Sequence, residues 1–172
     1  MSDPANMIHV LHVDDELGFA KTAATFLEQE NSQINVRTAA SPAEGLEMLA
    51  EHPIDCIVSD YDMPRTNGVE FLETVRELYP DVPFVLYTGK GSEEIAAEAI
   101  SAGVTDYLQK EVGADQYTIL ANRVVNAVER CRAEREAEHT RTQLEAISEH
   151  SADAIIIIDA DSQILFANPT VQ

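Results

Sequence analysis

Short apolar runs alternate with helical patterns between residues 8 and 108, and this alternation limits the possible folds more than any other feature. The runs are rich in Val, Ile and Leu, as in strands buried on both faces. Between them, apolar residues recur at spacings of three and four, the pattern of a helix packed on a sheet. The sequence therefore predicts an α/β fold with a doubly wound parallel sheet. The expected strands are Ile8–Val13, Ile34–Ala39, Ile54–Ser59, Val82–Thr88 and Thr105–Leu108.

Local signals place several helix ends. The segment from Ser41 to Glu44 reads as a capping box, with Pro42 at the first helical position. Gly103 stands where the fourth helix should end. A fifth helix should begin near Ala114 and run without Gly or Pro past His150 as one continuous, increasingly charged element.

Composition excludes several classes of partner. Asp and Glu number 31 against 11 Lys and Arg, so the net charge of −20 argues against direct binding to nucleic acid and against an acidic membrane surface. This acidic, lysine-poor composition resembles that of proteins from salt-loving organisms. The cysteines, Cys56 and Cys131, lack zinc-ligand spacing, which favours a reduced, cytoplasmic setting. No apolar run is long enough for membrane insertion.

Carboxylates follow two of the expected strands at the point where each strand ends. Asp14 and Asp15 close the first strand and Asp60 closes the third. In a flavodoxin-like strand order these two strands are neighbours at the switch point, where ligands bind in such sheets. Three converging carboxylates repel one another unless a cation neutralises them, and Mg2+ is the cation that suits a small all-oxygen site.

Two further strand ends add groups that can hold phosphate oxygens. Thr88 ends the fourth strand with a hydroxyl, and Lys110 follows the fifth strand with an ammonium. With the carboxylates and a divalent cation, these groups form a phosphoryl-transfer site in which Asp60 is the acceptor. Lys90 and Asp62 each stand two residues beyond a site residue, and we expect them to form an exposed ion pair across the mouth of the site.

Residues from about 7 to 128 resemble the receiver domain of two-component response regulators. The matching features are Asp14-Asp15, Asp60 with Met63-Pro64 and Gly68, Thr88, and Tyr107 three residues before Lys110. The resemblance implies a CheY-like five-stranded parallel sheet of order 2-1-3-4-5. It also implies a phosphoacceptor signalling domain, not an enzyme, whose partner is a histidine kinase or a phosphotransfer protein.

The same resemblance assigns roles to individual residues. It implies that Asp15 and Asp60 bind Mg2+ directly, that Asp14 acts through water, and that Asp62 supplies its main-chain carbonyl to the metal. Thr88 and Tyr107 match the positions of the family's switch. The family usually places a proline, often in a cis bond, after its lysine, whereas Glu111 follows Lys110 here. Because a non-proline cis bond is costly, the sequence does not predict the geometry of this loop.

The C-terminal part of the chain resembles other signalling proteins. We expect a helical linker at 129–150 and, at 151–172, the start of a PAS domain that is cut short after a β-hairpin. This order resembles haloarchaeal proteins that join a receiver to a PAS sensor. A homodimer is expected through a helical seam formed by Val124, Val128, Cys131, Leu144 and Ile147.

Two other functions fit part of the pattern. Asp60 and Asp62 could be the acid pair of a haloacid-dehalogenase-type phosphatase, although that family places its pair after the first strand. The domain could also be a pseudo-receiver, a dimerisation module that is never phosphorylated. Turnover of a generic phosphomonoester would distinguish the phosphatase from both kinds of receiver.

Overall fold

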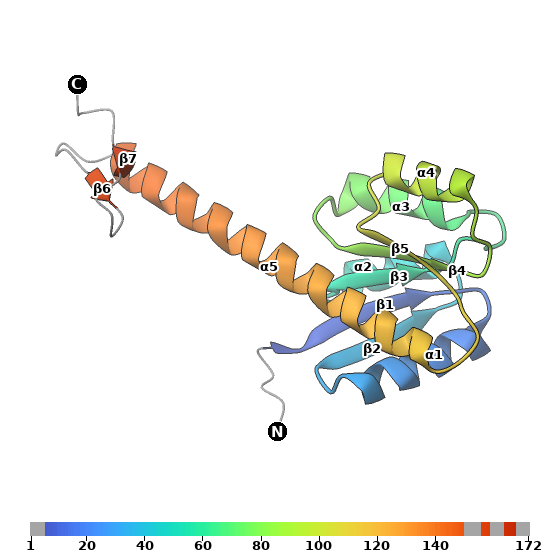
Figure 1. The fold of residues 1–172 in the computed structure, drawn as a ribbon. Coiled ribbons are helices and arrows are strands. Elements are labelled where there is room, and N and C mark those ends of the chain that lie inside the picture. Colours follow the sequence, from blue (N-terminus) through green and yellow to red (C-terminus); the bar gives the residue numbers. More distant parts are fainter. Residues whose placement is uncertain (1–5, 150–155, 159–163, 168–172) are drawn as a thin grey trace. The chain divides into compact units, whose positions relative to one another are not determined.

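The computed structural model describes residues 6–149, 156–158 and 164–167, and it describes side chains as far as residue 143. Five strands and five helices alternate in the first part of the chain (Figure 1). The strands are β1 (Ile8–Val13), β2 (Ile34–Ala39), β3 (Cys56–Ser59), β4 (Phe84–Thr88) and β5 (Asp106–Gln109). The helices are α1 (Leu17–Glu30), α2 (Pro42–Glu51), α3 (Gly68–Leu78), α4 (Glu93–Ser101) and α5 (Asp115–Glu149).

All five strands form one parallel sheet of order β2-β1-β3-β4-β5, which confirms the predicted fold class. The first two strands match the expected bounds. The next two begin two residues later than expected, at Cys56 and Phe84, and β5 is shifted by one residue. In each late strand the expected range included an apolar residue of the preceding loop, which hydrophobicity does not distinguish from a strand residue.

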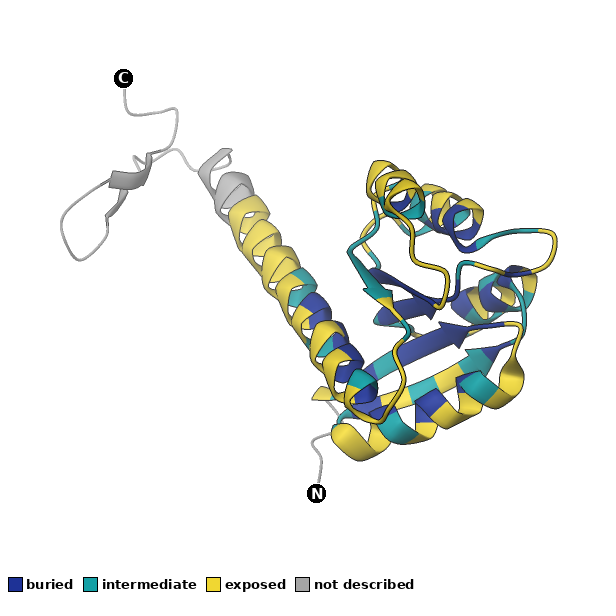
Figure 2. Cartoon of the chain, turned by 45° about the vertical axis from the view of Figure 1, so that its right-hand side comes forward, coloured by how far each residue is buried: buried dark blue, intermediate teal, exposed yellow. Residues whose placement is uncertain are grey.

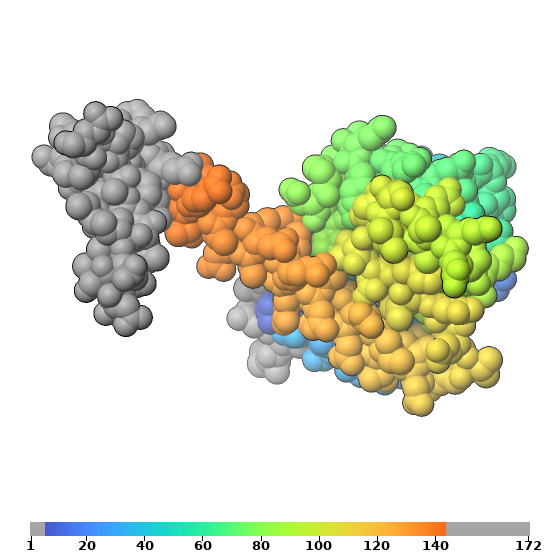
Figure 3. Space-filling model, turned by 45° about the horizontal axis from the view of Figure 1, so that its top comes forward, coloured from blue at the N-terminus to red at the C-terminus, as the bar shows by residue number. Residues whose placement is uncertain are grey.

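Helices cover both faces of the sheet because successive strand residues point to opposite sides. Leu11 of β1 packs with apolar side chains of α2, α3 and α4, whereas its neighbour Val10 packs with those of α1 and α5. The central strands are accordingly buried (Figure 2). On one face, α3 and α4 lie next to each other at the surface, where Figure 3 draws them in green and yellow-green.

Capping groups fix the helix starts that border the site. The Ser41 hydroxyl accepts a hydrogen bond from the backbone N–H of Glu44, as expected, but the Glu44 carboxylate accepts from Ala40 instead of completing the box. A complete capping box instead starts α3, where Asn67 and Glu70 each accept from the other's backbone N–H. Gly103 follows α4 with a φ of 84°, the left-handed conformation expected of a glycine at that position.

The chain divides into two compact units, residues 1–131 and 132–172. A single helix, α5, forms 115–149 as predicted, while His150 lies outside the described residues. In the second unit β6 (Ile156–Ile158) pairs antiparallel with β7 (Ile164–Ala167). These two strands fall within the expected hairpin, whose turn lies outside the described residues. No helix in the described part of the chain is long and apolar enough to span a bilayer.

The expected dimer seam is wrong in its first half. Val124 and Val128 are 0% and 1% exposed because they pack in the core against the sheet. Cys131 is half-buried and its thiol donates to the backbone carbonyl of Asp81 at 3.2 Å. The apolar stripe that suggested a partner helix therefore serves the domain's own core, and the side chains of Leu144 and Ile147 lie outside those described.

Candidate phosphoryl-transfer site

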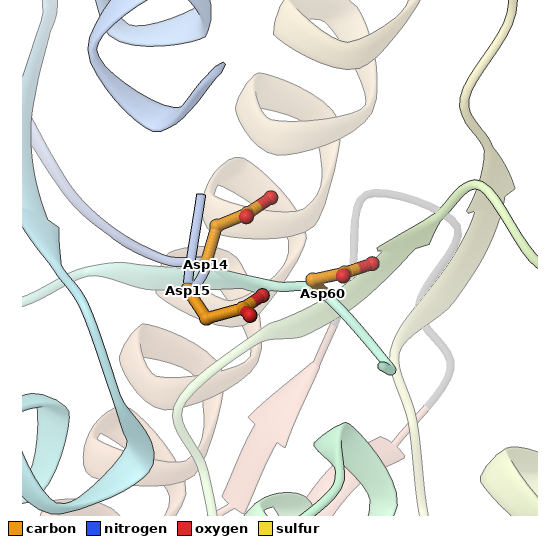
Figure 4. A group of neighbouring side chains, drawn as sticks. All are labelled: Asp14, Asp15 and Asp60. Atoms are coloured by element: carbon orange, nitrogen blue, oxygen red, sulfur yellow. The ribbon is translucent and has the colours of Figure 1, made fainter. Parts of the chain in front are cut away.

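The acidic cluster follows from the pairing of β1 with β3. Val13 and Ser59 are partners in the ladder, and the backbone N–H of Asp60 donates to the carbonyl of Val13 at 2.9 Å. The next residues, Asp14, Asp15 and Asp60, therefore lie together at the carboxyl edge of the sheet (Figure 4). One oxygen from each carboxylate lies within 4.8 Å of the others. The arrangement is an oxygen cluster suited to a small divalent cation.

The negative charge of this cluster must be compensated because two of its carboxylates are buried. Asp14 is 1% exposed and Asp60 7%, while Asp15 is exposed. Buried carboxylates remain ionised only when a cation or hydrogen bonds compensate their charge. The Lys110 ammonium lies 2.8 Å from Asp14 Oδ2 and 3.3 Å from Asp60 Oδ1. Asp14 Oδ1 also accepts from the backbone N–H of Glu16 at 2.8 Å, whereas Asp60 Oδ1 accepts no hydrogen bond from any described residue.

Lys110 is brought to the cluster without the proline that usually follows this lysine in the family. Its backbone N–H donates to the carbonyl of Thr88 at 2.8 Å, which extends the pairing of β5 with β4 by one residue. The peptide bonds among the described residues are all trans, including the one to Glu111. Phe19 and Tyr87 lie beneath the ammonium, 4.3 and 5.8 Å from Nζ to the ring centroids. Such cation–π contacts favour the charged lysine at this position.

The predicted switch residues lie on the neighbouring strands. Thr88, at the end of β4, is fully buried, and its hydroxyl oxygen accepts from the backbone N–H of Lys90 at 3.1 Å. The hydroxyl proton is left to donate to another group. Tyr107 on β5 pairs with Leu86 and is half-buried, with its hydroxyl enclosed and without a hydrogen-bond partner among the described residues.

The ion pair predicted between Lys90 and Asp62 is confirmed. The ammonium contacts Asp62 Oδ2 although both side chains are largely exposed, at 68% and 57%. The hydrogen bond from Lys90 and the charge of Asp62 raise the pKa of the lysine. The pair borders a cavity of about 320 Å³ lined by Asp15, Glu16, Phe19, Asp60, Asp62, Thr88, Gly89, Lys90 and Lys110. Two of the three clustered carboxylates, Asp15 and Asp60, thus line one cavity together with Thr88 and both lysines.

Gly68 allows the start of α3 to approach the backbone of Asp60 closely. A Cβ at Gly68 would lie 2.2 Å from the carbonyl oxygen of Asp60 and 2.8 Å from Leu86 Cδ1. The N–H of Gly68 donates to the carbonyl of Tyr61 at 2.9 Å, which closes the loop onto the start of α3. Met63 is buried in the core in this loop, while Arg65 takes a φ of 73°. The loop geometry that presents Asp60 therefore requires a glycine at this point.

Sequence reasoning missed the groups that surround Lys110. Phe19 and Tyr87 fit the apolar patterns of a helix and a strand, and those patterns do not show that the rings face an ammonium. His12 is fully buried, and its ring lies 6.3 Å from that of Phe19 in an edge-on arrangement. Burial lowers the pKa of His12 to about 4, so this histidine is neutral near pH 7 and adds no charge to the site.

Comparison with known proteins agrees with this architecture. The family model of the response regulator receiver domain matches residues 10–122. An NtrX-like response regulator of Rickettsia bellii is 32% identical over 120 residues, which cover 69% of this chain and 25% of that protein. The response regulator SaeR of Staphylococcus epidermidis is 28% identical over 119 residues, which cover 69% of this chain and 51% of that protein. The chain thus spans about a quarter to a half of these relatives.

Solved structures show the same similarity. A receiver domain protein of Clostridium thermocellum is 29% identical with a TM-score of 0.66, covering 74% of this chain and 98% of that one. Chemotaxis protein CheY4 of Vibrio cholerae is 30% identical with a TM-score of 0.63, covering 69% and 98%.

The fold and the acidic strand ends define the class, a doubly wound signalling module with a carboxylate site at its switch point. The chain belongs to the response regulator receiver domain family, the receivers of two-component signalling. This membership leaves the phosphatase alternative without support.

Proposed function

We propose that Asp60 accepts a phosphoryl group from a histidine kinase or a phosphotransfer protein, with Mg2+ held by the acidic cluster. The observation that carries the proposal is the cluster of three carboxylates with the Lys110 ammonium 3.3 Å from the buried Oδ1 of Asp60, an oxygen that accepts no hydrogen bond from the described residues. A carboxylate oxygen without a hydrogen-bond donor keeps its lone pairs available for attack on phosphorus.

The residues present fit Mg2+. Asp15 and Asp60 would bind the ion directly, Asp14 would act through water, and Asp62 would offer its main-chain carbonyl. The exposure of Asp15 leaves room for the water molecules that Mg2+ retains. When bound, the ion supplies charge neutralisation for the phosphoryl oxygens.

Side chains of the protein carry out the other parts of the phosphoryl transfer. An oxygen of Asp60 forms a bond to phosphorus while the bond from phosphorus to the donor's imidazole nitrogen breaks, and its electron pair leaves with the imidazole. The Lys110 ammonium already contacts Asp60, so it is placed to stabilise the negative charge on the oxygens of a phosphoryl group bound there. Thr88 can donate its free hydroxyl proton to one of those oxygens.

The same groups give a route for the signal. A hydrogen bond from Thr88 to the phosphoryl group would draw the hydroxyl toward Asp60 and away from the backbone N–H of Lys90. Tyr107 would then turn inward into the space that the threonine leaves. The hydroxyl of Tyr107 is enclosed and has no hydrogen-bond partner in the described part of the chain, which supports this role, because a buried polar group gains from a rearrangement that satisfies it.

The domain organisation is part of the proposal. We assign the receiver to 7–128, a helical linker to 129–150 and the start of a PAS domain to 151–172 in a cytoplasmic protein adapted to high salt, with the PAS domain as output. A homodimer through the linker remains a proposal, with its seam restricted to residues after Cys131 because the earlier valines are buried.

Incubation with acetyl phosphate tests the proposed chemistry. Phosphorylation should require Mg2+, and Asp60→Asn should abolish it because the amide cannot form the acyl phosphate. Asp62→Asn is the matched control, since it removes a neighbouring carboxylate that is not the acceptor. A domain that stays unphosphorylated with Mg2+ and excess donor would instead be a pseudo-receiver.

A further inference from the structure

Lys110 leads into a loop, residues 111–114, at the surface of the domain. Each of these loop residues is exposed, and Val112 is fully exposed although it is apolar. Gly113 adopts a φ of 118°, a conformation that other residues rarely take. An exposed loop of this kind loses much conformational entropy when it is ordered, so fixing the adjacent lysine requires specific polar contacts.

Gln116, in the first turn of α5, supplies such contacts. Its Nε2 donates to the carbonyl of Gly113 at 2.8 Å, and its Oε1 accepts from the backbone N–H of Glu111 at 3.2 Å. The same oxygen accepts from the hydroxyl of Tyr87. One amide group thus bonds to two residues of the loop and to a residue of β4. The three partners also fix the orientation of the amide, because two are donors and one is an acceptor.

Tyr87 connects Gln116 to the ammonium of Lys110. The Tyr87 side chain is 1% exposed, and its ring lies 5.8 Å from Lys110 Nζ and 6.1 Å from the ring of Phe19. Burial raises the pKa of the Tyr87 hydroxyl, which therefore stays protonated and donates to Gln116 at physiological pH. Gln116 consequently bonds both to the backbone that follows Lys110 and to a ring beneath its ammonium.

We propose that Gln116 positions Lys110 for phosphoryl transfer to Asp60. Gln116 contacts neither the carboxylates nor the cavity, so it acts through the loop and through Tyr87. In other receivers a proline usually follows this lysine, and its ring restricts the backbone. Here Glu111 follows Lys110, and the Gln116 amide holds the backbone at that point instead. The inference rests on the proposed function, because it assigns a partner to a lysine whose catalytic role is itself proposed.

The test compares four variants for the rate of phosphorylation by acetyl phosphate over a range of donor and Mg2+ concentrations. Gln116→Ala should lower the maximal rate about fivefold, because hydrogen bonds that align a reacting group are lost. Tyr87→Phe should lower it about threefold by removing one of these bonds. Gln116→Glu keeps the acceptor for Tyr87 and Glu111 but loses the donor to Gly113, so its rate should lie between those of wild type and Gln116→Ala.

Two readouts separate positioning from a loss of structure. The affinity for Mg2+, measured without donor, should not fall in any variant, because Lys110 is a positive charge beside the carboxylates and not a ligand of the ion. Thr118→Ala is the matched control in the same turn of α5: it removes the hydrogen bond of Thr118 to Glu30 at 2.9 Å and should leave the rate unchanged. Tyr87→Phe and Gln116→Glu keep the test decisive if Gln116→Ala does not fold.

Each outcome bears on one of the two proposals. A wild-type rate in Gln116→Ala, or a Gln116→Glu variant as slow as the alanine variant, would overturn the positioning role while leaving phosphorylation of Asp60 intact. A fall in Mg2+ affinity parallel to the rate would also overturn it, because the whole site would then have changed. A wild-type domain that takes no phosphoryl group would overturn the proposed function, and with it this inference.

Discussion

The two halves of α5 form one continuous helix, but the first half buries one face against the sheet and the second half is exposed. In the first half, Leu120, Ala121, Val124 and Val128 are at most 3% exposed and pack against the sheet. From 133 to 143, every residue is exposed. The described ion pair in that stretch, Arg141 with Glu138 at 3.6 Å, joins side chains that are 68% and 63% exposed. A pair in that position contributes little to stability.

The difference shows what each half can contribute to function. The packed half gains stability from tertiary contacts, so its geometry is tied to that of the sheet and of the acidic cluster. An exposed, highly charged helix gains stability mainly from weak local pairs. Its conformation is therefore free to respond to a partner, whether a second copy of the chain or an output domain.

The largest effect should come from the packed half. Leu120→Ala removes a side chain that is 0% exposed and should lower the free energy of unfolding by about 2–4 kcal/mol, through lost burial and the cavity left behind. The neighbouring Ile119→Ala, at a position 44% exposed, should cost less than about 1 kcal/mol. Urea denaturation of both variants measures the contrast. Equal losses would mean that the packing of α5 does not stabilise the domain.

The same contrast between packed and open positions applies to glycines. Gly68→Ala should destabilise the domain by about 1–3 kcal/mol, because the added methyl group meets the backbone oxygen of Asp60. It should also slow phosphorylation, since that backbone presents the acceptor. Gly18→Ala, in α1, meets nothing within 4 Å and should be neutral or stabilising by up to about 1 kcal/mol. Thermal unfolding and phosphorylation rates measure the contrast. If the two variants behaved alike, the close approach of the Asp60 backbone would not be what requires a glycine at position 68.

The smallest effect is expected at the exposed ion pair over the site. Lys90→Ala removes the partner of Asp62 and opens the mouth of the cavity, so the phosphorylated form should lose its phosphoryl group about two to three times faster. The effect should shrink in high salt, which screens exposed charges. Lys21→Ala, an exposed lysine on α1, is the control. An unchanged lifetime of the phosphorylated form in Lys90→Ala would show that this ion pair does not protect the phosphoryl group.

The sequence predicted most of the fold because hydrophobic periodicity reports directly on burial. The alternation of strand and helix gave the sheet class, and Ser41 and Gly103 marked helix ends through local chemistry. The same periodicity misled us at Val124 and Val128, since an apolar stripe on a helix has the same spacing whether it faces its own domain or a partner. The capping box at Asn67 and Glu70 follows the same local rule, since an asparagine is followed three residues later by a glutamate.

The acids of the site could be predicted because they follow buried strands, where a carboxylate has no structural reason to lie. The surroundings of Lys110 could not. Tyr87 reads as a core residue of a strand, and Gln116 as an ordinary polar residue of a helix. The hydrogen bond between these two residues depends on the packing of α5 against the sheet, which brings together residues 29 positions apart in sequence. Such contacts leave no local pattern.

Chemical trapping of the phosphorylated residue tests the central claim most directly. The domain would be phosphorylated with acetyl phosphate and Mg2+, then reduced with borohydride, which converts an aspartyl phosphate to homoserine, and sequenced by mass spectrometry. We expect homoserine at position 60, and none when Mg2+ is withheld. Homoserine at another aspartate, such as Asp15 or Asp62, or a phosphoryl group on a residue outside the cluster, would contradict it.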